Sequence, residues 1–483
     1  MFILEECTVD SIRAAFEGGE LTAHALVLMY LERIATIDQS GPHLNAVLEV
    51  NPDALFIAAA MDRERAAGKV RSPLHGVPVL LKDNINTADK LCTSAGSLAL
   101  ADHYATYDAS LVARLRAAGA VILGKANMTE LANFMSYTMK SGYSSRGGQV
   151  VNPYKAGAEV WGSSTGSAVA VSANLCALAV GTETNGSIIS PSFINGSVGI
   201  KPTLGLVSRH GIVPVCIAQD TAGPMTRTVA DAAALLNVLV GHDAHDPATW
   251  CLEDKIPADY TTFLNPHGLK GLRVGVNWHS AQREHPLMPF TEAHTALAHA
   301  ALDVMGACGA EIIHEATIPF QVKDLDVMLY EFRKCLNAYL STTNPANPVR
   351  KLEDLIAFYT SHPKEGLKYG MSILLDAQHK ASGNLTDAVY LEARARCLQQ
   401  SQAEGLDKVF AEHNLDVLVS PMLSGLAPIS GYPSICVPAG YLADGTPYGM
   451  IFVGKPFSEP LLIAAAYAYE QASHMRKAPQ WAL

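Results

Sequence analysis

The chain has 483 residues, of which 49% are hydrophobic and 17% charged, a composition that is typical of globular proteins and excludes disorder for most of its length. Its net charge of −11 does not supply the clustered cations that bind a phosphate backbone, so we expect no nucleic-acid partner. The longest stretch of small and apolar residues, 167–181, is too short for a membrane span, so we expect no membrane partner.

The N-terminal residues and the cysteines both indicate a cytoplasmic protein. Glu5 and Glu6 follow directly after the apolar residues 2–4, a start that lacks the cationic and apolar runs of a secretory signal. The nine cysteines are scattered and include no Cys-x-x-Cys pair. This pattern is typical of free thiols in a reducing compartment and predicts neither a disulfide framework nor a zinc site.

Residues 1–70 are predicted to form a helical layer. Thr8 and Thr22 are suitable N-cap residues, and apolar side chains recur at helical spacing after Thr22. We therefore expect packed helices here, not a loose tail.

Residues 71–235 form the predicted core, in which strands and helices alternate. Residues 77–82 are an apolar run typical of a buried strand, 110–118 are predicted to form a helix that ends at Gly119, and 120–123 are a second short strand. Between about 137 and 203 the composition changes to Gly, Ser, Thr, Ala and Asn. We expect the chemistry in this stretch.

The second half of the chain returns to ordinary amphipathic patterns. Residues 236–410 are predicted to be helical, for example over 291–305, and to shape the pocket. Residues 411–483 are expected to add core strands, at 416–420 and 434–437, and a C-terminal helix. The sequence contains no internal repeat and no long linker.

Common mechanistic motifs are absent or poorly supported. No glycine is followed by another two positions later, and no Gly-Lys pair precedes Ser or Thr, which excludes nucleotide-phosphate loops. His294 and His299 lie five positions apart, off the i, i+4 register that places two metal ligands on one helix face. The His and Asp residues of 242–246 could hold a metal in principle, but a polar loop explains them better than a metal site does. Residues 162–166 match Gly-x-Ser-x-Gly, but a loop precedes them where a nucleophile elbow needs a strand.

Three segments place a reactive side chain in or beside a tight bend, and each alone also has an ordinary structural explanation. Lys82 lies at the end of an apolar strand. Its side chain either extends so that the amine reaches water, or is buried so that the amine becomes a neutral base. The serines of 161–167 either cap a helix or supply hydroxyls to a site. Residues 184–187 either form a plain turn or align main-chain N–H groups as an oxyanion hole. The coincidence of all three indicates a catalytic site.

On these residues the chain resembles the amidase signature family. The family hallmark Gly-Gly-Ser-Ser-Gly-Gly-Ser, followed by Asp-x-Gly-Gly-Ser-Ile-Arg-x-Pro, corresponds to residues 161–167 and 183–191. The similarity covers nearly the whole chain and is least specific over 250–410. It includes the segments 76–84, 93–97, 124–130, 199–203, 223–231 and 433–440.

The resemblance implies a fold and a mechanism. The fold would be one α/β domain over residues 1–483, with a mixed central sheet covered by helices on both faces. The activity would be amide hydrolysis without a metal or cofactor. By position, Lys82, Ser163 and Ser187 resemble the family's lysine, cis-serine and nucleophile. Ser187 would form the acyl-enzyme while Ser163 and Lys82 relay its proton.

The resemblance also assigns supporting roles. The main-chain N–H groups of Thr184, Asn185, Gly186 and Ser187 would form the oxyanion hole, and Ser164 would support the triad from beside it.

Departures from the family pattern bear on the substrate. Asn185 and Ile189 stand where the family often has a glycine and an arginine. This variant, with residues 144–149 upstream, is similar to the peptide-amidase branch, which removes C-terminal amide groups from peptides. Small aliphatic or aryl amides stay open as substrates, as do carbamates and esters, because the same nucleophile would attack them. The alternative function is the glutaminase subunit of a tRNA-dependent amidotransferase complex, and a homodimer is allowed for.

Overall fold

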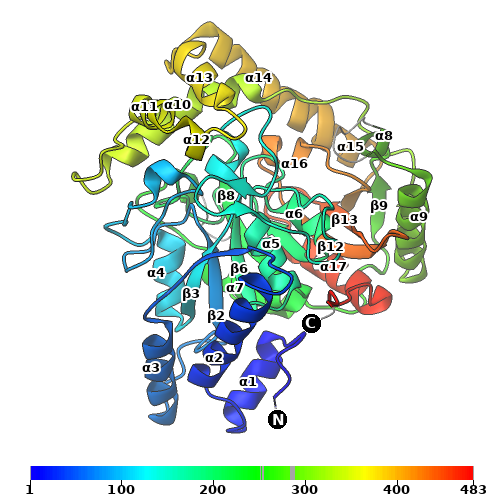
Figure 1. Cartoon of the computed structure of the whole chain (residues 1–483). Helices are drawn as coiled ribbons and strands as arrows, with labels where there is room; N and C mark the ends of the chain where they lie inside the picture. Colours follow the sequence, from blue (N-terminus) through cyan, green and yellow to red (C-terminus); the bar gives the residue numbers. More distant parts are fainter. Residues whose placement is uncertain (1, 251, 253–254, 283–288, 482–483) are drawn as a thin grey trace.

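An eleven-stranded sheet forms the centre of the computed structural model, which describes residues 2–250, 252, 255–282 and 289–481 (Figure 1). Its strands are, in spatial order, β1 (Val47–Val50), β3 (Val121–Ala126), β2 (Pro78–Lys82), β6 (Leu178–Glu183), β8 (Thr221–Thr226), β7 (Val198–Lys201), β12 (Ser434–Tyr441), β13 (Pro447–Val453), β11 (Val417–Ser420), β9 (Arg273–Val276) and β10 (Glu311–Ile313).

The sheet is mixed. Strands β3, β2 and β6 run parallel to one another, as do β11, β9 and β10. The strands between these two groups pair in antiparallel fashion, and β1 is antiparallel to β3. A small separate hairpin joins β4 (Tyr143–Ser144) to β5 (Gly148–Gln149). The expected α/β class with a mixed central sheet is confirmed.

Helices cover the sheet on both faces. Helices α5 and α6 contact each other and pack on β6 and β13, whereas α7 and α17 contact each other and pack on β8 and β12. Helices α10, α11, α13 and α14 gather at the top of Figure 1, far from α1–α3 at the bottom. The helices are α1 (Val9–Glu17), α2 (Ala23–Arg33), α3 (Ala54–Ala66), α4 (Ser110–Ala117), α5 (Thr165–Ser172), α6 (Ile189–Ile194), α7 (Val229–Leu239), α8 (His279–Gln282), α9 (Glu292–Ala307), α10 (Leu325–Ser341), α11 (Leu352–Ser361), α12 (Pro363–Gly366), α13 (Ser372–His379), α14 (Ala388–Ser401), α15 (Asp407–Glu412), α16 (Leu426–Ser430) and α17 (Glu459–Ser473).

The predicted elements are largely present. The hydroxyls of Thr8 and Thr22 accept N-cap hydrogen bonds from Ser11 N (3.2 Å) and Ala25 N (3.1 Å). Helices α4 and α9 and strands β2 and β11 lie where the sequence predicts them. Strands β3 and β12 extend further along the chain than predicted, because neighbouring strands pair with their additional residues.

Two predictions of helix-only segments were wrong. The first 70 residues include β1, and residues 236–410 include β9 and β10. These three strands lie at the two ends of the sheet. They are only three or four residues long, so sheet pairing rather than a recognisable local pattern specifies them.

The cysteines of the described part of the chain are all free thiols, and all of them except Cys308 are buried. Cys251 lies outside the described residues. Over the described ranges, no helix is both long and apolar enough to traverse a bilayer.

Candidate active site

The candidate site lies at the carboxyl ends of two neighbouring parallel strands, β2 and β6. Leu81 of β2 pairs with Val180 of β6, which brings Lys82 close to Thr182. Every residue of both strands is buried. In open α/β sheets ligands bind outside the carboxyl ends of the strands, so this edge is where chemistry is expected.

Lys82 is fully buried, and the hydrogen-bond partners of its amine among the described residues are all neutral groups. Nζ lies 2.7 Å from Ser163 Oγ, 2.9 Å from Thr182 Oγ1 and 3.1 Å from the Thr182 carbonyl oxygen. Burial lowers the pKa of Lys82 to about 7, although the carboxylates of Asp220 and Glu183 oppose this shift. The explanation in which this amine reaches water is therefore wrong.

The three partners of Lys82 can each accept a hydrogen bond from a protonated amine, and they also suit the neutral form. In the neutral form two N–H groups and one lone pair remain. A carbonyl oxygen only accepts, so one N–H donates to Thr182 O and the second donates to Thr182 Oγ1. The remaining lone pair then faces the Ser163 hydroxyl, which can donate its proton. In this arrangement a deprotonated Lys82 can accept a proton from the Ser163 hydroxyl.

Ser163 lies just before helix α5, and the Gly162–Ser163 peptide bond is cis, as the resemblance implies. The start of the helix packs tightly against the chain that follows β3. Gly166 N donates to Asn127 O (2.8 Å), and a Cβ at Gly166 would lie 2.3 Å from that oxygen. Only glycine allows the helix start to come this close to the main chain of Asn127, and this contact helps to position the serine-rich segment.

Ser164 occupies the N-cap position of α5, but its hydroxyl makes no capping hydrogen bond. It donates to Thr182 O (2.9 Å) and accepts from Thr182 N (3.2 Å). Its own N–H donates to Ser187 O (3.1 Å). The helix expected at this segment is present, whereas capping by Ser164 is not. Ser164 instead connects the helix start to β6 and to Ser187.

The residues between β6 and α6 form a tight turn. Gly186 has φ +83°, in the left-handed region that favours glycine. The carboxylate of Glu183 accepts hydrogen bonds from Ile188 N (2.7 Å) and Ile189 N (3.0 Å) beyond the turn. The Thr184 hydroxyl donates to Asp220. Side-chain hydrogen bonds therefore hold the turn at its start, through Thr184, and just beyond its end, through Ile188 and Ile189.

The main-chain amides of this turn are available for a ligand. Across the described part of the chain, none of the N–H groups from Thr184 to Ser187 donates to a protein acceptor. Ser187 is 7% exposed, and within the same described residues its hydroxyl makes no hydrogen bond to Ser163. Catalytic hydrogen bonds are often long in free enzymes and tighten only when substrate binds. The structure thus brings Lys82 and Ser163 into contact, with Ser187 adjoining them through Ser164.

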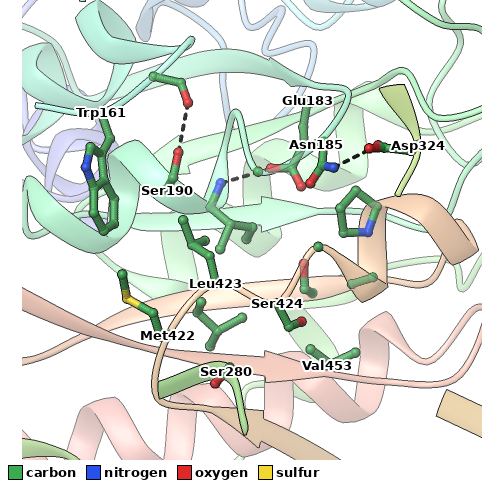
Figure 2. A pocket seen from close by; sticks show the side chains of 18 of the residues that line it. Trp161, Glu183, Asn185, Ser190, Ser280, Asp324, Met422, Leu423, Ser424 and Val453 are labelled. Atoms are coloured by element: carbon green, nitrogen blue, oxygen red, sulfur yellow. Dashed lines mark hydrogen bonds between the residues drawn. The ribbon is translucent and has the colours of Figure 1, made fainter. Parts of the chain in front are cut away.

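A cavity of about 480 Å³ opens beside this turn (Figure 2). Its wall includes Gly162 and Gly186, the direct chain neighbours of Ser163 and Ser187. Most of the remaining lining is apolar or uncharged. Its only charged side chains among the described residues are Glu183 and Asp324, and no lysine, arginine or histidine lines it there.

Several side chains that support the site were not predicted from the sequence. Asn84 donates to Thr182 Oγ1 (3.0 Å), and Asp220 accepts from Val215 N and Cys216 N (2.9 Å each) besides Thr184. Burial raises the pKa of Asp220 to about 6. Asn84 ends the segment 76–84 and Thr182 directly precedes the hallmark segment 183–191, whereas Asp220 lies in a loop that gives no local signal. Over the described ranges, no group of three or more His, Cys, Asp or Glu side chains is arranged to hold a metal.

Known proteins resemble this chain along nearly its full length. A family model described as Amidase matches residues 25–432. A probable amidase from Arabidopsis thaliana is 42% identical over 99% of this chain and 92% of its own. The solved structure of native peptide amidase from Stenotrophomonas maltophilia is 44% identical, covers 99% of both chains and superposes with a TM-score of 0.91. A glutamyl-tRNA(Gln) amidotransferase subunit from Synechococcus elongatus is 34% identical over 97% of this chain and 99% of its own.

Proposed function

The chain belongs to the amidase family and hydrolyses amide C–N bonds, and we propose that it does so through a Ser187 acyl-enzyme with Ser163 and Lys82 as proton relay. We further propose that its substrates are the C-terminal amides of peptides. The observation that carries the mechanism is the fully buried amine of Lys82, with its pKa lowered to about 7, at 2.7 Å from Ser163 Oγ.

The relay has a direct chemical rationale. Ser187 attacks the amide carbonyl carbon while its proton passes to Ser163 and the proton of Ser163 passes to Lys82. The amide oxygen becomes an oxyanion beside the N–H groups of the 184–187 turn, which have no described protein acceptor. When the C–N bond breaks, the proton returns along the relay to the departing nitrogen, and ammonia leaves.

Deacylation uses the same groups in the reverse order. A water molecule takes the place of ammonia and attacks the acyl ester carbon while the relay accepts its proton. The ester C–O bond then breaks, the proton returns to Ser187, and the carboxylic acid product is released. Each proton that Lys82 accepts is given back within the same half-reaction, so the enzyme ends the cycle unchanged.

The cavity supports a peptide amide as the substrate. Its described lining offers no cation for a substrate carboxylate, and Ile189 stands in the wall where the family pattern often has arginine. In a C-terminally amidated peptide the terminal carboxyl group is the one that forms the amide, so the substrate has no C-terminal carboxylate that would need a cation. The likeness to a peptide amidase at 44% identity supports the same choice.

The same observation weighs against the glutaminase alternative. Free glutamine carries an α-carboxylate, and burying it beside Glu183 and Asp324 without a cation would be unfavourable. The amidotransferase protein is also less similar, at 34% identity, than the amidases described above.

An ammonia-release assay with the purified chain alone tests the proposal. The panel contains C-terminally amidated peptides, the matching free acids, free glutamine, small aliphatic amides and aryl amides. We expect ammonia from the peptide amides, and kcat/KM for them at least about tenfold above that for glutamine. Release from glutamine only, or release that requires added partner proteins, would favour the amidotransferase alternative.

A further inference from the structure

Asp324 lies in the cavity wall with its carboxylate turned away from the helix that it precedes. It is the N-cap residue of α10, where an aspartate side chain ordinarily accepts from the first amides of the helix, yet it makes no capping hydrogen bond. Its Oδ2 accepts instead from Asn185 Nδ2 (2.8 Å) and Gln219 Nε2 (2.9 Å). Figure 2 shows Asn185 and Asp324 side by side at this wall.

The charge of Asp324 has no partner of opposite sign among the described residues. Oδ1 accepts no hydrogen bond there, and no lysine, arginine or histidine lies within salt-bridge distance of the carboxylate. The residue is only 8% exposed. Buried charges are normally paired, so a carboxylate fixed by two neutral amides at a cavity wall is suited to a cationic ligand.

The position of Asp324 relates this charge to the reaction. Its partner Asn185 belongs to the same turn as Ser187, two residues earlier in the chain. The other charged residue of the wall, Glu183, uses Oε2 to hold Ile188 N and Ile189 N. Its Oε1 accepts no hydrogen bond among the described residues, but Glu183 is only 1% exposed and its charge acts on the buried amines of Lys82 and Lys201. Asp324 is therefore the more exposed of the two lining carboxylates, and it also has one oxygen without a described hydrogen bond.

We infer that Asp324 is a specificity-determining residue that selects substrates with a free N-terminal ammonium, so that short peptide amides with an unblocked N-terminus are preferred over N-acylated ones. This inference rests on the proposed function, because it assumes that the cavity receives the acyl part of the amide. The apolar residues of the same wall, such as Met422 and Val453, then accommodate uncharged side chains of the peptide.

The test compares matched substrate pairs at pH 7, where an N-terminal amine with its ordinary pKa near 7.7–8.0 is mostly charged. The pairs are an amino-acid amide, a dipeptide amide and a tripeptide amide, each with a free and an acetylated N-terminus. Their kcat/KM values are measured for the natural chain, for Asp324→Asn, and for Asp326→Asn. Asp326 is exposed on the same helix and does not line the cavity, so its variant makes the same charge change as a control.

We expect the natural chain and Asp326→Asn to prefer the free form at least tenfold in one or more pairs. Asp324→Asn should reduce that preference to about threefold or less while retaining activity on the acetylated form. Because acetyl bulk affects every variant alike, the change in the ratio isolates the charge. Thermal unfolding of each variant confirms that the comparison is made on folded protein.

Two outcomes overturn the inference and differ from failure of the proposed function. If the natural chain cleaves free and acetylated peptide amides equally well, or if Asp324→Asn keeps the preference, the role of Asp324 is refuted while peptide amide hydrolysis stands. If no peptide amide in either form releases ammonia, the proposed function itself fails.

Discussion

Lys82 Nζ lies 2.7 Å from Ser163 Oγ, although the two residues are 81 positions apart in the chain. The contact arises because β2 and β6 are neighbouring parallel strands and because the start of α5 is held against the end of β6 through Thr182. Lys82 is thus held at the end of a buried strand, and burial of its amine lowers the pKa to about 7. This one contact determines what the site can do with a proton.

Replacing the amine with an apolar chain of similar length tests its role as a base. Lys82→Met should lower kcat by roughly 100-fold to 10,000-fold, the usual contribution of a general base. Its unfolding midpoint should stay near that of the natural chain, since methionine fills the same buried space without a polar group to desolvate. Steady-state kinetics and thermal unfolding measure both effects.

Lys125→Met is a matched control for this variant. Lys125 is also fully buried with its pKa lowered to about 8, but it donates to Ile85 O and Thr93 Oγ1, not to Ser163. Its variant should keep turnover within about tenfold of the natural chain. Equal losses in the two folded variants would contradict a special role for Lys82.

The pH dependence of kcat/KM should follow the Lys82 amine. Because the pKa of Lys82 is lowered to about 7, kcat/KM should fall as pH decreases through about 7, where the amine becomes protonated and can no longer accept. The negative charge of Asp220 raises the pKa of Lys82, so Asp220→Asn should move this acidic limb to lower pH. Rates measured from about pH 5 to 9 decide the matter, and a limb that stays fixed or moves upward would argue against Lys82 as the titrating group.

Ser164 should act through positioning. Ser164→Ala removes both hydrogen bonds to Thr182, which also holds Lys82, so kcat should fall about 10-fold to 100-fold with little change in KM. Ser167→Ala serves as the comparison, because Ser167 lies in the same helix and donates to Val180 O (3.2 Å) instead. A larger loss of kcat in Ser167→Ala than in Ser164→Ala would contradict this role.

The elements with a strong local pattern could be predicted from the sequence. The apolar run ending at Lys82 and the capped helices after Thr8 and Thr22 are specified by their own residues. Strands β1, β9 and β10 could not be recognised, because their pairing partners are distant in the chain. Burial of Lys82 was likewise undecided by the sequence, since a lysine at a strand end reaches water in many folds.

The same division applies to the site. Lys82, Ser163 and the 184–187 turn stand in recognisable motifs, so the sequence could nominate them. Asp220 and Asp324 stand in no motif, and only tertiary structure brings them to the turn through Thr184 and Asn185. Both aspartates are distant in sequence from the motifs that they contact, so no local spacing in the sequence could identify them.

The most direct test of the account is to identify the residue that forms the acyl-enzyme. The natural chain, Ser187→Ala and Ser190→Ala are treated with a serine-directed phosphonate and mapped by mass spectrometry of proteolytic peptides. Ser190 lines the same cavity and donates to Gly162 O (2.8 Å), which makes it the matched hydroxyl. We expect a single adduct on Ser187 in the natural chain and in Ser190→Ala, and none in Ser187→Ala. An adduct on Ser163 or Ser164, or full labelling of Ser187→Ala, would contradict the account.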